Sequence, residues 1–95
     1  MTDYAKVMIE KGGVSSLQES IDIGRQVMKK KLAVYLKKSE KFEQDEGMNT
    51  AAFIELFNRG ELGDDKVWME WDHTVDVVKL LKKKIDDIEN LKYEY

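Results

Sequence analysis

The only histidine in this chain, His73, stands three residues after Glu70. On a helix this spacing places both side chains at neighbouring points of one face, as in the Glu-x-x-His pairs of carboxylate-bridged di-iron bundles. Such bundles draw further glutamates from other helices, and Glu40 and Glu43 are the candidates here. One alternative is therefore a metal-binding four-helix bundle.

Glu40 and Glu43 also form a Glu-x-x-Glu pair, the arrangement with which all-α nucleotide pyrophosphohydrolases hold Mg²⁺. Those enzymes add a second acidic pair from the next helix. Glu70 with His73 does not complete the pattern, because Mg²⁺ prefers oxygen ligands. The simpler interpretation is a solvated helical face with mixed charge pairs. We therefore predict a non-enzymatic protein without cofactor or metal, and keep both chemistries as alternatives.

Composition narrows the class of protein. The 95 residues fit one domain spanning positions 1–95. No cysteine is present, and the net charge of −3 gives no basic field that would indicate nucleic acid by itself. There is no membrane-length apolar run and no signal-peptide pattern, so we expect a cytoplasmic location.

Three lysine clusters occupy positions 29–31, 37–38 and 82–84. Consecutive residues of a helix point about 100° apart, so each cluster is expected to splay instead of forming one patch. We interpret the clusters as solvated faces. Nucleic-acid binding stays open, chiefly around positions 29–31 and the N-terminal segment.

Helical periodicity dominates the rest of the chain. Apolar or small residues recur at steps of three and four from Leu17 to Phe42, and a heptad seam runs from Val67 to Ile88. We predict an all-α fold: a long antiparallel hairpin of helices at about 16–46 and 65–92, with a short helix at about 50–59. Residues 1–13 are expected to be flexible or a short strand or helix.

Helix-capping signals set the expected boundaries. Ser16 and Glu19 fit a capping box at the first helix start. Gly47 and Gly60 fit helix stops. The remaining signals are N-caps, namely Asn49 or Thr50 for the short helix and Asp64 or Asp65 for the last.

An antiparallel arrangement of the long helices predicts a register. Phe42 is expected to face Val67, and Trp71 is expected to be structural and to fill the space above Ser39. Glycine inside a helix costs about 1 kcal/mol relative to alanine. We therefore expect Gly24 to mark a close approach of the two helices.

Apolar residues outside this seam require another surface. A hairpin alone would leave them exposed, and extended exposed apolar patches usually mark interfaces. We predict a two-fold homodimer forming a four-helix bundle, with a monomer as the alternative. The expected partner-binding residues are Trp68, Phe53, Phe57, Ile23, Val27 and Val34.

The run "GMNTAAFIELFNRGELGDDKVWMEW" resembles a recurrent block in short archaeal and cyanobacterial proteins, many of them antitoxin-like. The shared positions are Gly47, Met48, Phe53, Phe57, residues 60–65, Glu70 and Trp71. The resemblance covers about a quarter of the chain closely. It implies no catalytic residue. It implies a small dimeric helical protein that binds a toxin-like partner, with binding to its own operator left open.

Overall fold

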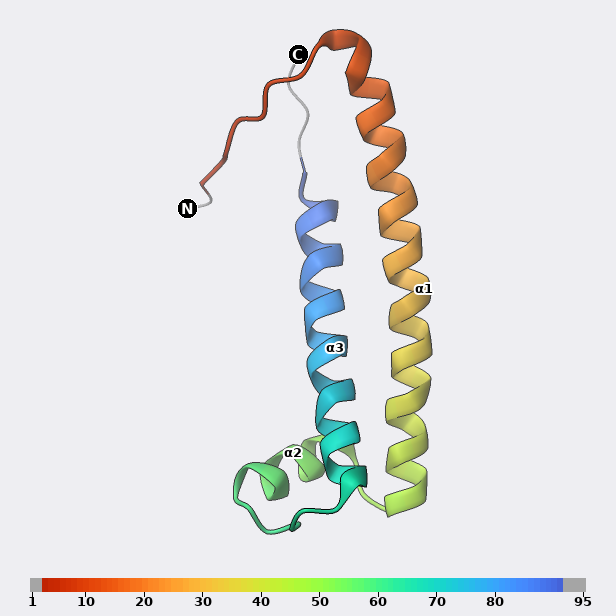
Figure 1. The fold of residues 1–95 in the computed structure, drawn as a ribbon, viewed down its shortest axis with the longest axis vertical. Coiled ribbons are helices and arrows are strands. Elements are labelled where there is room, and N and C mark those ends of the chain that lie inside the picture. Colours follow the sequence, from red (N-terminus) through yellow and green to blue (C-terminus); the bar gives the residue numbers. More distant parts are fainter. Residues whose placement is uncertain (1–2, 92–95) are drawn as a thin grey trace.

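Three α-helices make up most of the computed structural model, which describes residues 3–91. A short 3-10 turn, η1 (Lys11–Gly13), leads into α1 (Val14–Glu46); α2 (Thr50–Asn58) and α3 (Lys66–Glu89) follow. Figure 1 shows α1 and α3 side by side and antiparallel, with α2 beside the elbow that joins them. These residues contain no strand, so the predicted all-α hairpin with a short elbow helix is confirmed.

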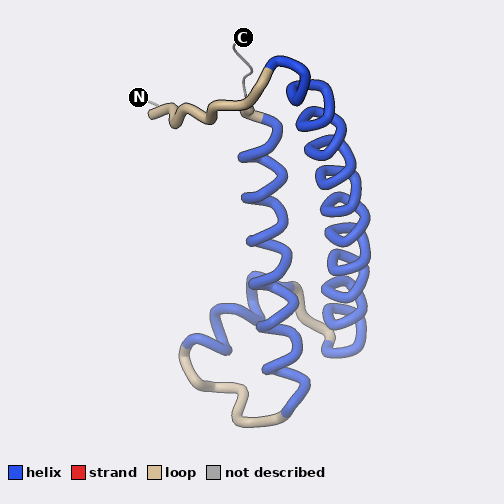
Figure 2. Tube along the Cα trace, turned by 45° about the horizontal axis from the view of Figure 1, so that its top comes forward, coloured by secondary structure: helices blue, strands red, loops and turns tan. Residues whose placement is uncertain are grey.

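The molecule is long and thin, with principal extents of 55 × 28 × 18 Å. Figure 2 shows loops at the elbow, in the segment before α1 and in a short stretch after α3. Away from α2 the hairpin is a single layer of two helices. None of the helices within residues 3–91 combines the length and apolarity needed to cross a bilayer.

The start of α1 differs from the expected capping box. The helix begins at Val14, and Gly13 in the N-cap position offers no side chain to bond the free N–H groups. Ser16 and Glu19 therefore lie within the first turns and not at the boundary. The stop at Gly47 is confirmed: this glycine has a φ of 66°, and its N–H donates to the Glu43 carbonyl at 3.0 Å.

Both ends of α2 follow the predicted chemistry. The Asn49 side chain accepts a hydrogen bond from the Ala52 N–H at 2.8 Å, which satisfies one free donor of the first turn. At the other end, the N–H of Gly60 donates to the Phe57 carbonyl at 3.0 Å and that of Glu61 to the Leu56 carbonyl at 3.1 Å. This pair of bonds around a left-handed glycine is a Schellman motif.

Helix α3 is shorter than expected. Asp65 occupies its N-cap position, although the carboxylate makes no capping hydrogen bond, and the helix ends at Glu89. The predicted end at residue 92 lies outside the described residues. Before α1, residues 3–10 adopt no regular structure. Of the strand or helix left open for residues 1–13, the described part of the chain forms only the 3-10 turn η1.

The predicted seam between the long helices is present, but its register is shifted. Phe42 stacks on Trp71 with ring centroids 5.6 Å apart, so Phe42 occupies the place expected for Ser39. Ser39 instead hydrogen-bonds the Thr50 hydroxyl at 3.1 Å. The shift arises because α2 supplies Phe53 to the other side of the elbow core, which a two-helix register cannot anticipate. On α3 the seam buries Trp71, Thr74, Leu81 and Ile85.

The expected close approach at Gly24 is wrong. A methyl group added at Gly24 would meet no other atom within 4 Å, so the helices leave room for a larger side chain. The glycine is not explained by packing.

Candidate functional site

The elbow core fixes where the two long helices meet. Phe53 and Trp71 are fully buried, and Val75 packs with them. Trp71 contacts one phenylalanine from each of the other helices, Phe42 of α1 and Phe53 of α2. The half-buried residues that complete this core are Met48, Ile54, Phe57, Leu62 and Trp68.

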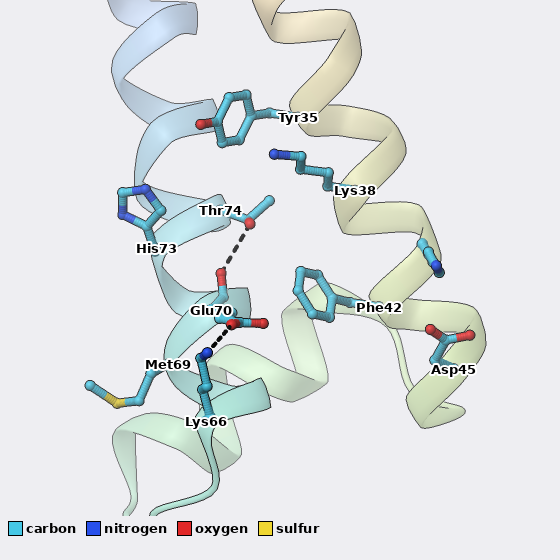
Figure 3. A pocket seen from close by; sticks show the side chains of 10 residues that line it. Tyr35, Lys38, Phe42, Asp45, Lys66, Met69, Glu70, His73 and Thr74 are labelled. Carbon is cyan, nitrogen blue, oxygen red and sulfur yellow. Dashed lines mark hydrogen bonds and ion pairs between the residues drawn. The ribbon is translucent and has the colours of Figure 1, made fainter.

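A groove of about 660 Å³ opens between α1 and α3 next to this core. No residue of α2 lines it, and Figure 3 shows α2 behind the two long helices in this view. Trp68 contacts Phe53 of α2, whereas Glu70 lines the groove. Trp68 and Glu70 are two positions apart on α3, so their side chains point about 200° away from each other. Therefore α2 and the groove lie on opposite sides of α3.

The groove has an apolar base and a charged rim. Its apolar base comes from Tyr35 and Phe42, and Met69, which is 60% exposed, lies at its rim. Charged and polar side chains surround this base: Lys38, Lys41, Asp45, Lys66, Glu70, His73 and Thr74.

Partners of the rim residues are visible in Figure 3. The Lys66 ammonium lies 3.5 Å from the Glu70 carboxylate, so part of the charge on this side is neutralised. The buried Thr74 hydroxyl donates to the Glu70 carbonyl at 3.0 Å, so its proton is already used within α3. Lys38 lies over the Tyr35 ring at 4.6 Å, a cation–π contact that holds the ammonium at the groove edge.

Three parallel rows of side chains lead along α1 to this groove. Residues seven apart on a helix project in nearly the same direction. The central row holds Val27, Val34 and Lys41, and the last of these lines the groove. One flanking row holds Ile23, Lys30 and Lys37; the other holds Lys31, Lys38 and Asp45. We call the surface made by these three rows, the central row together with both flanking rows, the lysine-flanked row.

The lysine-flanked row modifies the interpretation of the lysine clusters. Consecutive lysines do point about 100° apart. Because the two pairs at 30–31 and 37–38 straddle the same central row, however, they place positive charge on both sides of it. All four side chains are exposed.

Helix α3 continues the same face. His73 lines the groove, and Leu80 follows it by seven residues; Glu70 lines the groove, and Val77 follows it by seven. Leu80 is 51% exposed and Val77 is half-buried. The apolar residues of both helices above the groove thus lie on one face, opposite α2.

The predicted partner-binding residues divide into two groups. Ile23, Val27 and Val34 are 63%, 58% and 51% exposed, as a docking surface requires. The expectation that Phe53 is an exposed aromatic is wrong, because its ring is fully buried in the elbow core. Phe57 and Trp68 are half-buried and pack against the same core, so they offer little free surface.

The four residues of the metal alternative do not line one cavity. Glu70 and His73 face the groove, while Glu40 and Glu43 line a separate surface hollow beside Gly47. The Glu43 carboxylate also accepts the Thr50 N–H at 2.8 Å. Within residues 3–91 no cluster of three or more His, Asp or Glu side chains is suited to a metal ion.

Comparison with known proteins gave no match to a family model, a curated protein or a solved structure. The candidate site therefore rests on this chain's own geometry.

Several groove residues were not singled out from the sequence. The sequence places Tyr35 in the seam and Lys38 in a lysine cluster. It assigns no role to Lys41 or Met69. A signal was present, since Val27, Val34 and Lys41 follow one another at seven-residue steps. That spacing shows which residues share a row, but only the placement of α3 shows that the row ends in a groove.

Proposed function

We propose that this protein is a non-enzymatic helical interaction module, which binds another protein through the face opposite α2. One observation carries the proposal: α1 is 33 residues long and contains no buried residue, yet the lysine-flanked row exposes Ile23, Val27 and Val34. A long helix with apolar side chains normally buries them against a second layer.

The position of the core supports the same proposal. Buried aromatic residues gather at the elbow, so the upper hairpin depends on a single seam. On the face opposite α2, Ile23, Val27 and Val34 stay more than half exposed in the folded monomer. An exposed apolar surface with a polar rim is the usual character of a protein-binding site.

The antitoxin-like resemblance fits this proposal. Its block supplies the elbow, in which Gly60 and Gly63 adopt positive φ angles of 72° and 81°. We propose that the block is a structural device that fixes the hairpin, and that a cytoplasmic toxin-like protein binds the exposed face.

Assembly into a homodimeric four-helix bundle is the second candidate. The observation that favours it is that α1 and α3 both contribute apolar residues to the same open face. Sedimentation velocity at micromolar concentration distinguishes a homodimer from a monomer. A parent dimer that dissociates in the Val27→Asp variant would show that the homodimer uses this face.

Co-expression with the product of an adjacent reading frame tests the main proposal. We expect a stoichiometric complex that the Val27→Asp and Val34→Asp variants lose while retaining their helical circular dichroism. Met69→Asp, on the rim of the groove, is a comparison that maps how far the interface extends. If both valine variants keep every complex that the parent forms, the proposed face is not the interface.

The metal alternative has its own measurement. Protein purified without chelator is expected to contain no stoichiometric iron, manganese or zinc. Stoichiometric metal that is lost in Glu70→Ala would instead favour the metal-binding bundle.

A further inference from the structure

We infer that the lysine-flanked row and the adjoining groove bind an acidic amphipathic helix from a partner protein. The inference rests on the proposed function and specifies the chemistry of the partner.

Charge on this face is opposite in sign to that of the whole chain. The chain carries a net charge of −3. The lysine-flanked row contains five lysines, at positions 30, 31, 37, 38 and 41, and one acidic residue, Asp45. None of these lysines forms an ion pair with another residue in the range 3–91. Carboxylates on a partner would complement this field and direct association.

The arrangement of the charges indicates a helical partner. Apolar side chains form a narrow central line, and lysines lie on both sides of it. A helix with an apolar stripe flanked by Glu or Asp presents the matching pattern, as in paired helices whose edge charges select the partner. From residue 23 to residue 41 the row is about 27 Å long at 1.5 Å per residue. A partner helix of about five turns would cover it.

The groove supplies an end point for such a helix. Its base of Tyr35 and Phe42 can accept an apolar side chain, while Lys38 and Lys41 stand at its edge. Val34 of α1 and Leu80 of α3 lie along the path above it, and both are half exposed. The partner would therefore pack between two helices, not on an isolated ridge.

Other occupants fit the charges or the shape less well. A second copy that placed α1 against α1 would bring the two sets of lysines together, which is unfavourable. Helices that lie on membrane surfaces usually insert Trp, Phe or Leu, whereas this row offers only isoleucine and valine. Nucleic acid would match the lysines but leave the apolar row without a function.

Synthetic peptides provide a direct test. The probe is a fluorescein-labelled, side-chain-stapled helix of about five turns with Leu and Ile in one stripe and Glu along both edges. One comparison peptide replaces each Glu with Lys, and another scrambles the acidic sequence so that the stripe is lost. Fluorescence anisotropy with the full chain measures each Kd at low and high salt.

We expect the acidic helix to bind at least about tenfold more tightly than the lysine peptide, with affinity falling as salt screens the charges. The double variant Lys31→Glu/Lys38→Glu leaves three lysines against three acidic residues on this surface and should abolish this preference. A matched control is Lys79→Glu/Lys82→Glu, which makes the same charge change on the side of α3 that carries Trp68 and Val75. This control should keep the parent preference.

Several results would overturn the inference. They are equal binding of the acidic, basic and scrambled peptides, or equal weakening by the control variant. Binding only to phosphatidylglycerol vesicles would also overturn it, and so would a tight homodimer through Val27 that excludes the peptide. The homodimer result would leave the proposed interaction function intact. If the Val27→Asp and Val34→Asp variants kept every complex that the parent forms, that function itself would be contradicted.

Discussion

Phe53 of α2 and Trp71 of α3 stack with ring centroids 4.0 Å apart and ring planes 5° from parallel. Both side chains are fully buried, and Phe42 of α1 stacks on the same tryptophan. Three helices thus meet at one indole ring. The elbow is the best-packed part of this molecule, and the open face on α1 is held in position from that end.

Truncation of Trp71 should therefore destabilise the whole fold. Removing a buried aromatic ring loses transfer free energy and leaves a cavity, so Trp71→Ala is expected to cost about 3–5 kcal/mol of unfolding free energy. Chemical denaturation followed by circular dichroism measures the change. Met69→Ala on the same helix, where the side chain is 60% exposed, should change stability little. Similar midpoints for the two variants would contradict the elbow core.

Filling the space at Gly24 should stabilise the protein. A Cβ at this position meets nothing within 4 Å, and the helical backbone there is regular. Gly24→Ala is expected to add about 0.5–1 kcal/mol, because alanine loses less backbone entropy on folding. The reverse exchange Ala33→Gly, at an exposed site on the same helix, should destabilise by a similar amount. A lower melting temperature for Gly24→Ala would restore the idea of a close approach.

Gly47 should respond in the opposite direction to substitution. Its φ of 66° lies in the left-handed region, where a Cβ costs roughly 1–2 kcal/mol. Gly47→Ala should lower the melting temperature even though a Cβ there also meets open space. The control is Gly12→Ala, at a glycine with equally open surroundings and no positive φ. Equal effects at the two sites would argue against backbone strain as the cause.

One ion pair near the open end of the hairpin gives a pH-dependent prediction. The Lys29 ammonium lies 2.9 Å from the Glu89 carboxylate, and its hydrogen bond and positive charge lower the pKa of Glu89. A carboxyl with a lowered pKa in the folded state contributes stability above its unfolded pKa. That contribution is lost as pH falls through the folded value.

NMR titration of the Glu89 side chain checks this prediction. The Lys29→Met variant should raise the pKa of Glu89 towards its ordinary value, and salt should have a similar, smaller effect because both side chains are half exposed. Lys30→Met is the control, since Lys30 points about 100° away from this pair. An unchanged pKa in Lys29→Met would show that α1 and α3 do not meet here.

Local signals in the sequence determined most of the secondary structure. Gly47, Asn49 and Gly60 act as predicted, because backbone chirality and the free N–H groups of a first turn depend on only a few neighbouring residues. The alternation of three- and four-residue steps also identified the seam, since it depends on helix geometry alone. The exposure of Ile23, Val27 and Val34 followed from the same periodicity.

Tertiary structure alone decided which residues meet. Periodicity places Phe53 on the apolar face of α2 but does not say that Trp71 covers it, so an expected surface residue is fully buried. It likewise does not set the offset between α1 and α3, which the third helix determines by packing into the elbow. The groove needs both helices at that offset, since it joins residues about thirty positions apart along the chain, such as Lys38 and Glu70. Its existence depends on long-range packing, whereas caps and rows depend on local geometry.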